Sequence, residues 1–227
     1  MSQPIEVLWT DDALLAVNKP AGLPTLPDGW QPDAPYLVGR LQAEQGRLWV
    51  VHRLDRGTSG VLLLARSADA HRSLDRQFAA HAVDKVYHAL VAGAPAWDEQ
   101  TVRLPLLANG DRKHRTVVDP RRGRPALTRC QALERFAGCA LVEARPETGR
   151  THQIRAHLAA LGHPLLADPL YTRAGIVLPD IAPPLIERPA LHAVSLTVAH
   201  PVTGQALTLI APYPTDFSDA LRRLRAG

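Results

Sequence analysis

The chain has 227 residues, of which 46% are hydrophobic, enough to bury the core of one large domain or two small ones. Its formal net charge of +4 favours a polyanionic partner without proving one. No run of 18 apolar residues is present and residues 1–10 lack the features of a signal peptide, so neither a membrane-spanning helix nor secretion is predicted.

The first predicted elements are a hairpin and a helix. Residues 5–9 and 13–17 are largely apolar runs on either side of Asp11 and Asp12, as is typical of two strands paired in a hairpin. Residues 18–24 are too rich in Pro and Gly for regular structure. Apolar residues within 35–45 then recur at the helical period, and Gly46 predicts the end of that helix.

A polar loop, residues 52–60, separates two apolar runs at residues 49–51 and 61–65, which are typical of buried strands. A loop held between two core strands can present a carboxylate rigidly, and Asp55 is the acid that this loop contains. A surface turn with a solvated ion pair to the neighbouring arginines explains the same residues. The spacing alone therefore leaves both interpretations open.

A second helix is predicted after this loop, from an N-cap at Ser67 to about residue 80. Residues 83–91 then alternate as a strand does, which places Lys85 and Tyr87 on one face. A Tyr next to a Lys on the less apolar face could be a residue at the rim of the sheet or a site residue, but a half-buried packing residue gives the same pattern.

Residues 103–129 form the densest basic segment of the chain. They could be a solvated pair of strands, but a hairpin or loop that contacts phosphates fits the net charge better. The basic residues of this segment are Arg103, Arg112, Lys113, Arg115, Arg121, Arg122, Arg124 and Arg129.

Two strands at residues 126–134 and 139–144 are predicted to pair as an antiparallel hairpin. They carry Cys130 and Cys139, which lack the spacing of a zinc site and are predicted to be reduced packing residues.

Residues 147–158 predict a turn followed by a helix that begins at Thr151 and ends near Gly162. Arg155 comes directly after the core-facing Ile154, so its guanidinium is expected to need a carboxylate partner.

The end of the chain predicts a variable Pro-rich loop, a hairpin and a last helix. The loop covers residues 173–188, the two strands residues 191–199 and 207–211, and the helix begins at Thr215.

Three motifs of this chain resemble those of the RluA-type pseudouridine synthase family. They are HRLDRGTSG at residues 52–60, KVYHAL at 85–90 and TGRTHQIR at 148–155. Residues 18–24 resemble the NKPxGL motif of the same family, and residues 163–171 resemble its GHPxxGDxxY motif, except that Ala167 stands where Gly is usual. The motifs follow one another in the order of the family.

The resemblance implies an α+β fold with a mixed, largely antiparallel sheet, flanking helices and a central catalytic cleft. It implies a single catalytic domain at residues 1–227 without an N-terminal RNA-binding module. The implied activity is isomerisation of a specific uridine in structured rRNA or tRNA to pseudouridine, after the base has been flipped into a pocket. Asp55 would be the catalytic residue, Tyr87 an active-site residue and Arg155 the partner of Asp55.

Contacts to RNA or substrate are expected from further polar and basic residues, among which Arg53 would fill the gap left by the flipped base. No cofactor or metal is implied, and we expect a monomer in the cytoplasm. The expected contact residues are Lys19, His52, Arg53, Arg56, Lys85, Arg115, Arg121, Arg122, Arg150 and His152.

Competing functions fit the sequence less well. A glycoside hydrolase would need two carboxylates, and no second acid stands in a motif like that of Asp55. A metalloenzyme would need His and acid ligands at fixed spacing, and the ten histidines include no HExxH. An RNA-binding protein without activity is the strongest rival, but it would not need Asp55, Tyr87 and Arg155 together.

Overall fold

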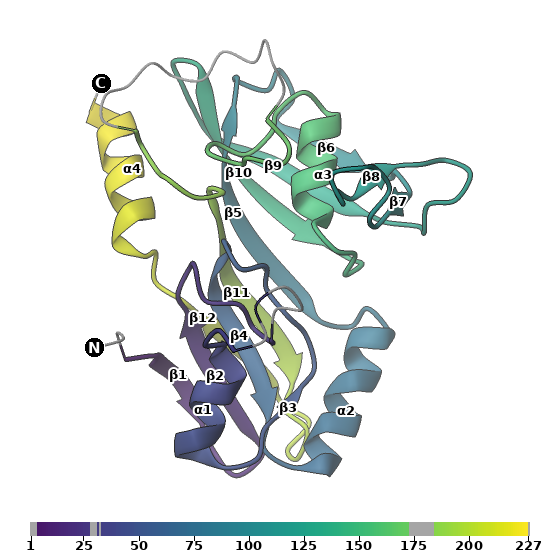
Figure 1. Ribbon diagram of the computed structural model, residues 1–227, viewed down its shortest axis with the longest axis vertical. Coiled ribbons are helices and arrows are strands. Elements are labelled where there is room, and N and C mark those ends of the chain that lie inside the picture. Colours follow the sequence, from purple (N-terminus) through teal and green to yellow (C-terminus); the bar gives the residue numbers. More distant parts are fainter. Residues whose placement is uncertain (1–3, 28–30, 32, 173–183, 227) are drawn as a thin grey trace. The chain divides into compact units, whose positions relative to one another are not determined.

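The computed structural model describes residues 4–27, 31, 33–172 and 184–226. These residues form two compact units, and Figure 1 draws their helices and strands in colours that follow the sequence. The first unit comprises residues 1–85 and 193–213, and the second comprises residues 86–192 and 214–227. The expectation that residues 1–227 act as one catalytic domain remains a prediction.

The strands of the first unit follow the order β1-β2-β4-β11, in which β2 pairs antiparallel with both β1 and β4. Every residue of β4 is buried, as expected for the apolar run that follows the polar loop. The short strand β3 pairs with the end of β4, and β12 pairs with β11. The strands are β1 (Glu6–Thr10), β2 (Leu14–Lys19), β3 (Trp49–Val50), β4 (Ser59–Ala65), β11 (Leu191–Ala199) and β12 (Ala206–Ile210).

Two helices belong to this unit, α1 (Leu37–Gln45) and α2 (Ala68–Ala79). The helix α2 begins where predicted, because the side chain of Ser67 accepts a hydrogen bond from the amide of Ala70 at 3.1 Å. Leu74 of α2 is fully buried in a core that includes residues of β2, β4 and β11.

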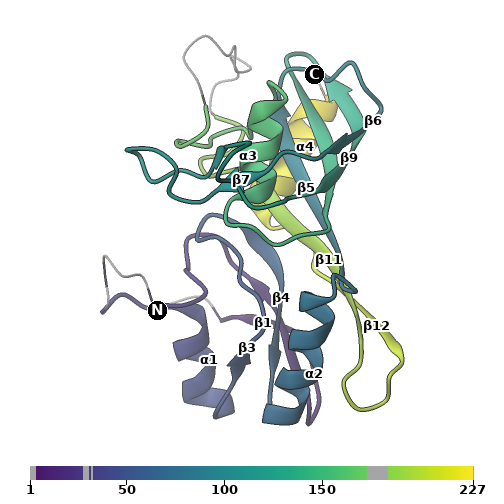
Figure 2. The same cartoon turned by 90° about the vertical axis from the view of Figure 1, so that its right-hand side faces the viewer.

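The second unit contains an antiparallel sheet with the order β5-β10-β9-β6. Figures 1 and 2 show the helices α3 and α4 on opposite sides of this sheet. The two-residue strands β7 and β8 form a separate small hairpin. The elements are β5 (Asp84–Ala92), β6 (Glu99–Val102), β7 (Leu106–Leu107), β8 (Val117–Val118), β9 (Thr128–Phe136), β10 (Cys139–Pro146), α3 (Gln153–Ala160) and α4 (Thr215–Ala226).

Antiparallel pairing and four helices in the described residues confirm the α+β class. Cys130 and Cys139 are both buried and reduced, as predicted. They are not opposite each other in the hairpin, because Cys130 pairs with Ala144 and Cys139 with Phe136. Within the described part of the chain, no helix is long and apolar enough to cross a membrane. The predicted loop at 173–188 lies largely outside the described residues, which resume at 184.

Candidate active site

The two residues that flank Asp55 are held in place through their main chains. The hydroxyl of Thr25 donates to the carbonyl of Leu54 at 2.9 Å and accepts from the amide of Leu54 at 3.3 Å. On the other side, the amide of Gly22 donates to the carbonyl of Arg56 at 2.8 Å, and Nε of Arg56 donates back to the carbonyl of Gly22 at 3.0 Å. The segment before α1 therefore braces the loop directly before and directly after Asp55.

A buried ammonium group completes this brace. Lys19 is 0% exposed, and its Nζ donates to the carbonyls of Pro20 at 2.9 Å, Leu23 at 2.7 Å and Arg56 at 3.4 Å. A buried cation needs such acceptors, and here they join the Pro-rich segment to the polar loop. Lys19 was expected to contact RNA, but a direct phosphate contact would require its ammonium to leave these carbonyls.

The side chains around Asp55 differ in their exposure. Arg53 and Arg56 are exposed, Leu54 is buried, and Asp55 lies between these extremes. Its carbonyl accepts from the amide of Thr58 at 3.0 Å, which closes a tight turn. The loop is thus a polar turn with one partly sheltered carboxylate, and the catalytic role of Asp55 remains a prediction.

Gly60, at the beginning of β4, cannot be another residue in this backbone. Its φ is +114°, and an added Cβ would lie 2.1 Å from the carbonyl oxygen of Ala193 on β11. Glycine is therefore required here both by the backbone conformation and by the close approach of the neighbouring chain.

His52 anchors the beginning of the loop. Its Nε2 accepts from the amide of Leu63 at 3.0 Å, and its ring stacks on Phe78 of α2 with centroids 5.0 Å apart. Burial, together with the charge of Lys85, lowers the pKa of His52 to about 3. The imidazole is therefore neutral at physiological pH, and its contacts are those of a structural residue.

Lys85 and Tyr87 lie near the beginning of β5, where both are half-buried. Burial lowers the pKa of Lys85, while the carboxylate of Asp84 acts in the opposite direction. Tyr87 packs against the core that α3 covers. The active-site role expected for Tyr87 remains a prediction.

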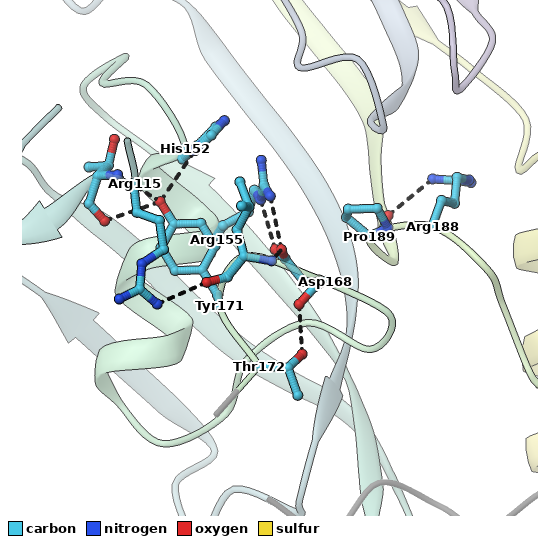
Figure 3. A network of polar contacts seen from close by, with 10 residues as sticks. Arg115, His152, Arg155, Asp168, Tyr171, Thr172, Arg188 and Pro189 are labelled. Atoms are coloured by element: carbon cyan, nitrogen blue, oxygen red, sulfur yellow. Dashed lines mark hydrogen bonds and ion pairs between the residues drawn. The ribbon is translucent and has the colours of Figure 1, made fainter. Parts of the chain in front are cut away.

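Arg155 forms a bidentate ion pair with Asp168, a residue that the sequence analysis did not select (Figure 3). Nε lies 2.7 Å from Oδ2 and Nη2 lies 2.9 Å from Oδ1, and the side chains are 7% and 0% exposed. The expectation that Arg155 needs a carboxylate is thus met inside its own unit. Asp55 belongs to the other unit, so its pairing with Arg155 remains a prediction.

Tyr171 lies against the same guanidinium. The Cζ of Arg155 is 5.1 Å from the centre of the Tyr171 ring, a cation–π distance. The phenol donates to the carbonyl of Thr116 at 3.1 Å and accepts from the amide of Thr116 at 3.0 Å, and Nδ1 of His152 is 3.2 Å away. Burial raises the pKa of Tyr171, so the phenol keeps the proton that it donates.

The basic segment at 103–129 is largely exposed, as a phosphate-binding surface requires. Of its eight basic residues, all except Arg115 are exposed. Arg115 instead donates to Asp111 at 2.7 Å and to the carbonyl of Leu170 at 2.9 Å, which makes it a brace. Arg121 and Arg122 follow Asp119, whose carboxylate accepts from both of their amides.

Arg150 extends this basic surface from the turn before α3. Its Nε donates to the carbonyl of Pro125 at 3.1 Å. Desolvation and the nearby charge of Arg124 lower its pKa, so two guanidinium groups gather at one point of the surface.

Comparison with known proteins gives one consistent result. The RNA pseudouridylate synthase family matches residues 13–160. A dual-specificity RNA pseudouridine synthase of Escherichia coli K12 is 38% identical over 91% of this chain and 92% of its own. The ribosomal large subunit pseudouridine synthase D of Zymomonas mobilis is 36% identical over 94% and 70%. The solved structure of human RNA pseudouridylate synthase domain containing 4 is 27% identical, with a TM-score of 0.77 over 97% and 93%.

Proposed function

Because the chain belongs to the RNA pseudouridylate synthase family and is therefore an RNA-modifying isomerase, we propose that it converts a specific uridine of structured rRNA or tRNA to pseudouridine with Asp55 as the catalytic residue. The braced loop carries this assignment. Both neighbours of Asp55 are held through their main chains, so the carboxylate starts the reaction from a fixed position.

The reaction breaks the bond between uracil N1 and the ribose and rejoins the base to the ribose through C5. N1 gains a hydrogen and C5 loses one, so the product is an isomer and no co-reactant is consumed. A single carboxylate can act in such a step as a nucleophile or as a base. The partial shelter of Asp55 fits either role, because a reacting group must be reached by the base yet kept from bulk water.

Arg155 is proposed as the partner of Asp55, and Tyr87 as a residue of the same pocket. The buried and oriented guanidinium of Arg155 supports the first assignment. The half-buried aromatic ring of Tyr87 supports the second, since such a ring can stack on a flipped base.

RNA binding is proposed to use the exposed basic residues. Arg53 is exposed two positions before Asp55, so it could fill the gap in the RNA while Asp55 meets the flipped base. The exposed arginines of residues 103–129, with Arg150, would contact phosphates. The name of one bacterial relative, a ribosomal large subunit pseudouridine synthase, makes rRNA the first substrate to test. Transfer RNA is tested beside it, because the resemblance of the motifs implied either RNA.

A direct assay tests this proposal. The purified protein is incubated with uridine-labelled rRNA and tRNA, and the RNA is analysed for pseudouridine, with and without EDTA. We expect product in both conditions, because the proposed chemistry uses no metal. Position-resolved mapping of cellular RNA with and without the gene then identifies the target uridine.

Asp55→Asn separates catalysis from folding. This variant should lose turnover while its RNA affinity and thermal stability stay near those of the wild type. Asp75→Asn, an exposed position on α2 of the same unit, is the matched control and should retain full turnover. Appreciable pseudouridine formation by Asp55→Asn would exclude the catalytic role. RNA binding by the wild type without any product would instead indicate an inactive RNA-binding protein.

A further inference from the structure

We propose that Asp168 is a positioning residue for the reaction, because it fixes the plane and direction of the Arg155 guanidinium. The inference rests on the proposed function, in which Arg155 faces the catalytic carboxylate. Asp168 itself would touch neither the RNA nor Asp55, and its effect would pass through Arg155.

The contact between the two side chains determines how the guanidinium is oriented. Asp168 uses both of its oxygens, on Nε at 2.7 Å and on Nη2 at 2.9 Å, so the planar fork cannot rotate without breaking a hydrogen bond. The ring of Tyr171 covers the guanidinium at 5.1 Å and restricts its displacement out of the plane. A single carboxylate contact would leave both motions open.

The carboxylate of Asp168 is itself held firmly. Its Oδ1 accepts from the amide of Leu170 at 3.0 Å, and its backbone carbonyl accepts from the hydroxyl of Thr172 at 2.7 Å (Figure 3). The side chain is 0% exposed, and these contacts together with those to Arg155 restrain it to one rotamer. The turn at residues 168–171 therefore fixes the orientation of the Arg155 guanidinium.

That turn is tied at its other end to the hairpin of β7 and β8. Leu170 accepts from Nη1 of Arg115 at 2.9 Å, and the phenol of Tyr171 bonds both main-chain groups of Thr116. Residues 168–171 thus hold Arg155 on one side and the basic hairpin on the other. If Asp168 served only to neutralise the charge of Arg155, this second attachment to the hairpin would not be needed.

The chain offers a matched pair for an experiment. Arg188 and Asp216 also form a bidentate pair in the second unit, at 2.6 and 3.0 Å, but Asp216 is 44% exposed and has no place in the proposed site. Asp168→Asn and Asp216→Asn remove the same charge from the same kind of pair. Single-turnover rates at saturating enzyme, RNA dissociation constants and thermal unfolding are measured for both variants and the wild type.

Loss of orientation should appear in the rate rather than in binding. Asp168→Asn should lower the single-turnover rate roughly 100-fold with RNA affinity unchanged, because a misplacement of about 1 Å caused by a distant mutation can cost about that factor. Asp216→Asn should keep the wild-type rate. A folded Asp168→Asn with the wild-type rate, or with a loss explained by weaker RNA binding alone, would overturn the inference.

Asp168→Glu addresses the case in which Asp168→Asn fails to fold. Glu keeps the charge but displaces the carboxylate, so a folded Asp168→Glu should still turn over slowly. A folded Asp168→Glu at the wild-type rate, or failure of both variants to fold, would assign Asp168 a structural role alone. A wild-type protein that makes no pseudouridine would refute the proposed function itself, an outcome distinct from any of these.

Discussion

Lys19→Met tests the brace beneath the Asp55 loop. The substitution keeps the length of the side chain but removes the ammonium that donates to the carbonyls of Pro20, Leu23 and Arg56. The contacts at 2.9 and 2.7 Å have a charged donor, and such hydrogen bonds contribute about 1.5–3 kcal/mol each. Relief from burying a charge offsets part of that loss. We therefore expect the free energy of unfolding to fall by about 2–4 kcal/mol.

The assay is urea and thermal denaturation beside the single-turnover measurement. For a chain of this length, the expected loss lowers Tm by about 4–16 °C. Lys113→Met is the matched control, since Lys113 is exposed, and it should stay within about 0.5 kcal/mol of the wild type. If Lys19→Met were as stable as this control, the three carbonyls would not depend on the ammonium and the loop would not be braced by it. Folded Lys19→Met should also turn over more slowly.

Four further outcomes are expected. Arg155→Leu should lose about 3–5 kcal/mol of stability in denaturation, because it leaves Asp168 buried and unpaired. Arg155→Lys should restore little activity in the turnover assay, because an ammonium lacks the planar fork. Charge reversal of Arg121 and Arg122 to Glu should weaken RNA binding and flatten the slope of log affinity against log salt; an unchanged slope would place the RNA elsewhere. The folded-state pKa of His52 is about 3, below its unfolded value, so the unfolded chain binds the proton first. The free energy of unfolding should therefore fall as the pH drops from about 6.5 to 3. In pH-dependent unfolding, His52→Gln should reduce this loss by about 2–4 kcal/mol. Ala167→Gly should raise Tm, because the φ of +53° at Ala167 is a left-handed conformation that costs a residue with a Cβ about 1–2 kcal/mol. An unchanged Tm would mean that this backbone strain is absent.

The regular elements could be predicted because their signals are local. The hairpins follow from alternation within a few residues, and α2 follows from the cap at Ser67. The helix α1 ends at Gly46, whose φ of +74° is the conformation that glycine adopts readily. Each of these signals lies within one turn or one strand of the residue that it explains.

The support of the site could not be predicted, because its signals are not periodic. Lys19 reaches a carbonyl 37 positions away, and a main-chain acceptor leaves no trace in the sequence. Asp168 stands in an irregular turn 13 positions after Arg155, although its place in the GHPxxGDxxY-like stretch was a signal that could have found it. The same stretch carries Ala167, where the usual Gly marks the left-handed backbone that the structure contains.

The brace around Asp55 has a consequence for how this loop could change during evolution. Two of the three contacts at position 56, those from Lys19 and from the amide of Gly22, end on its carbonyl rather than its side chain. A carbonyl is present whatever the residue, and the side chain at this position is exposed. A substitution at position 56 would therefore lose the contact from Nε to Gly22 but keep the two contacts that hold the loop beside Asp55. Positions 19 and 25, whose side chains supply the bonds, have no such freedom.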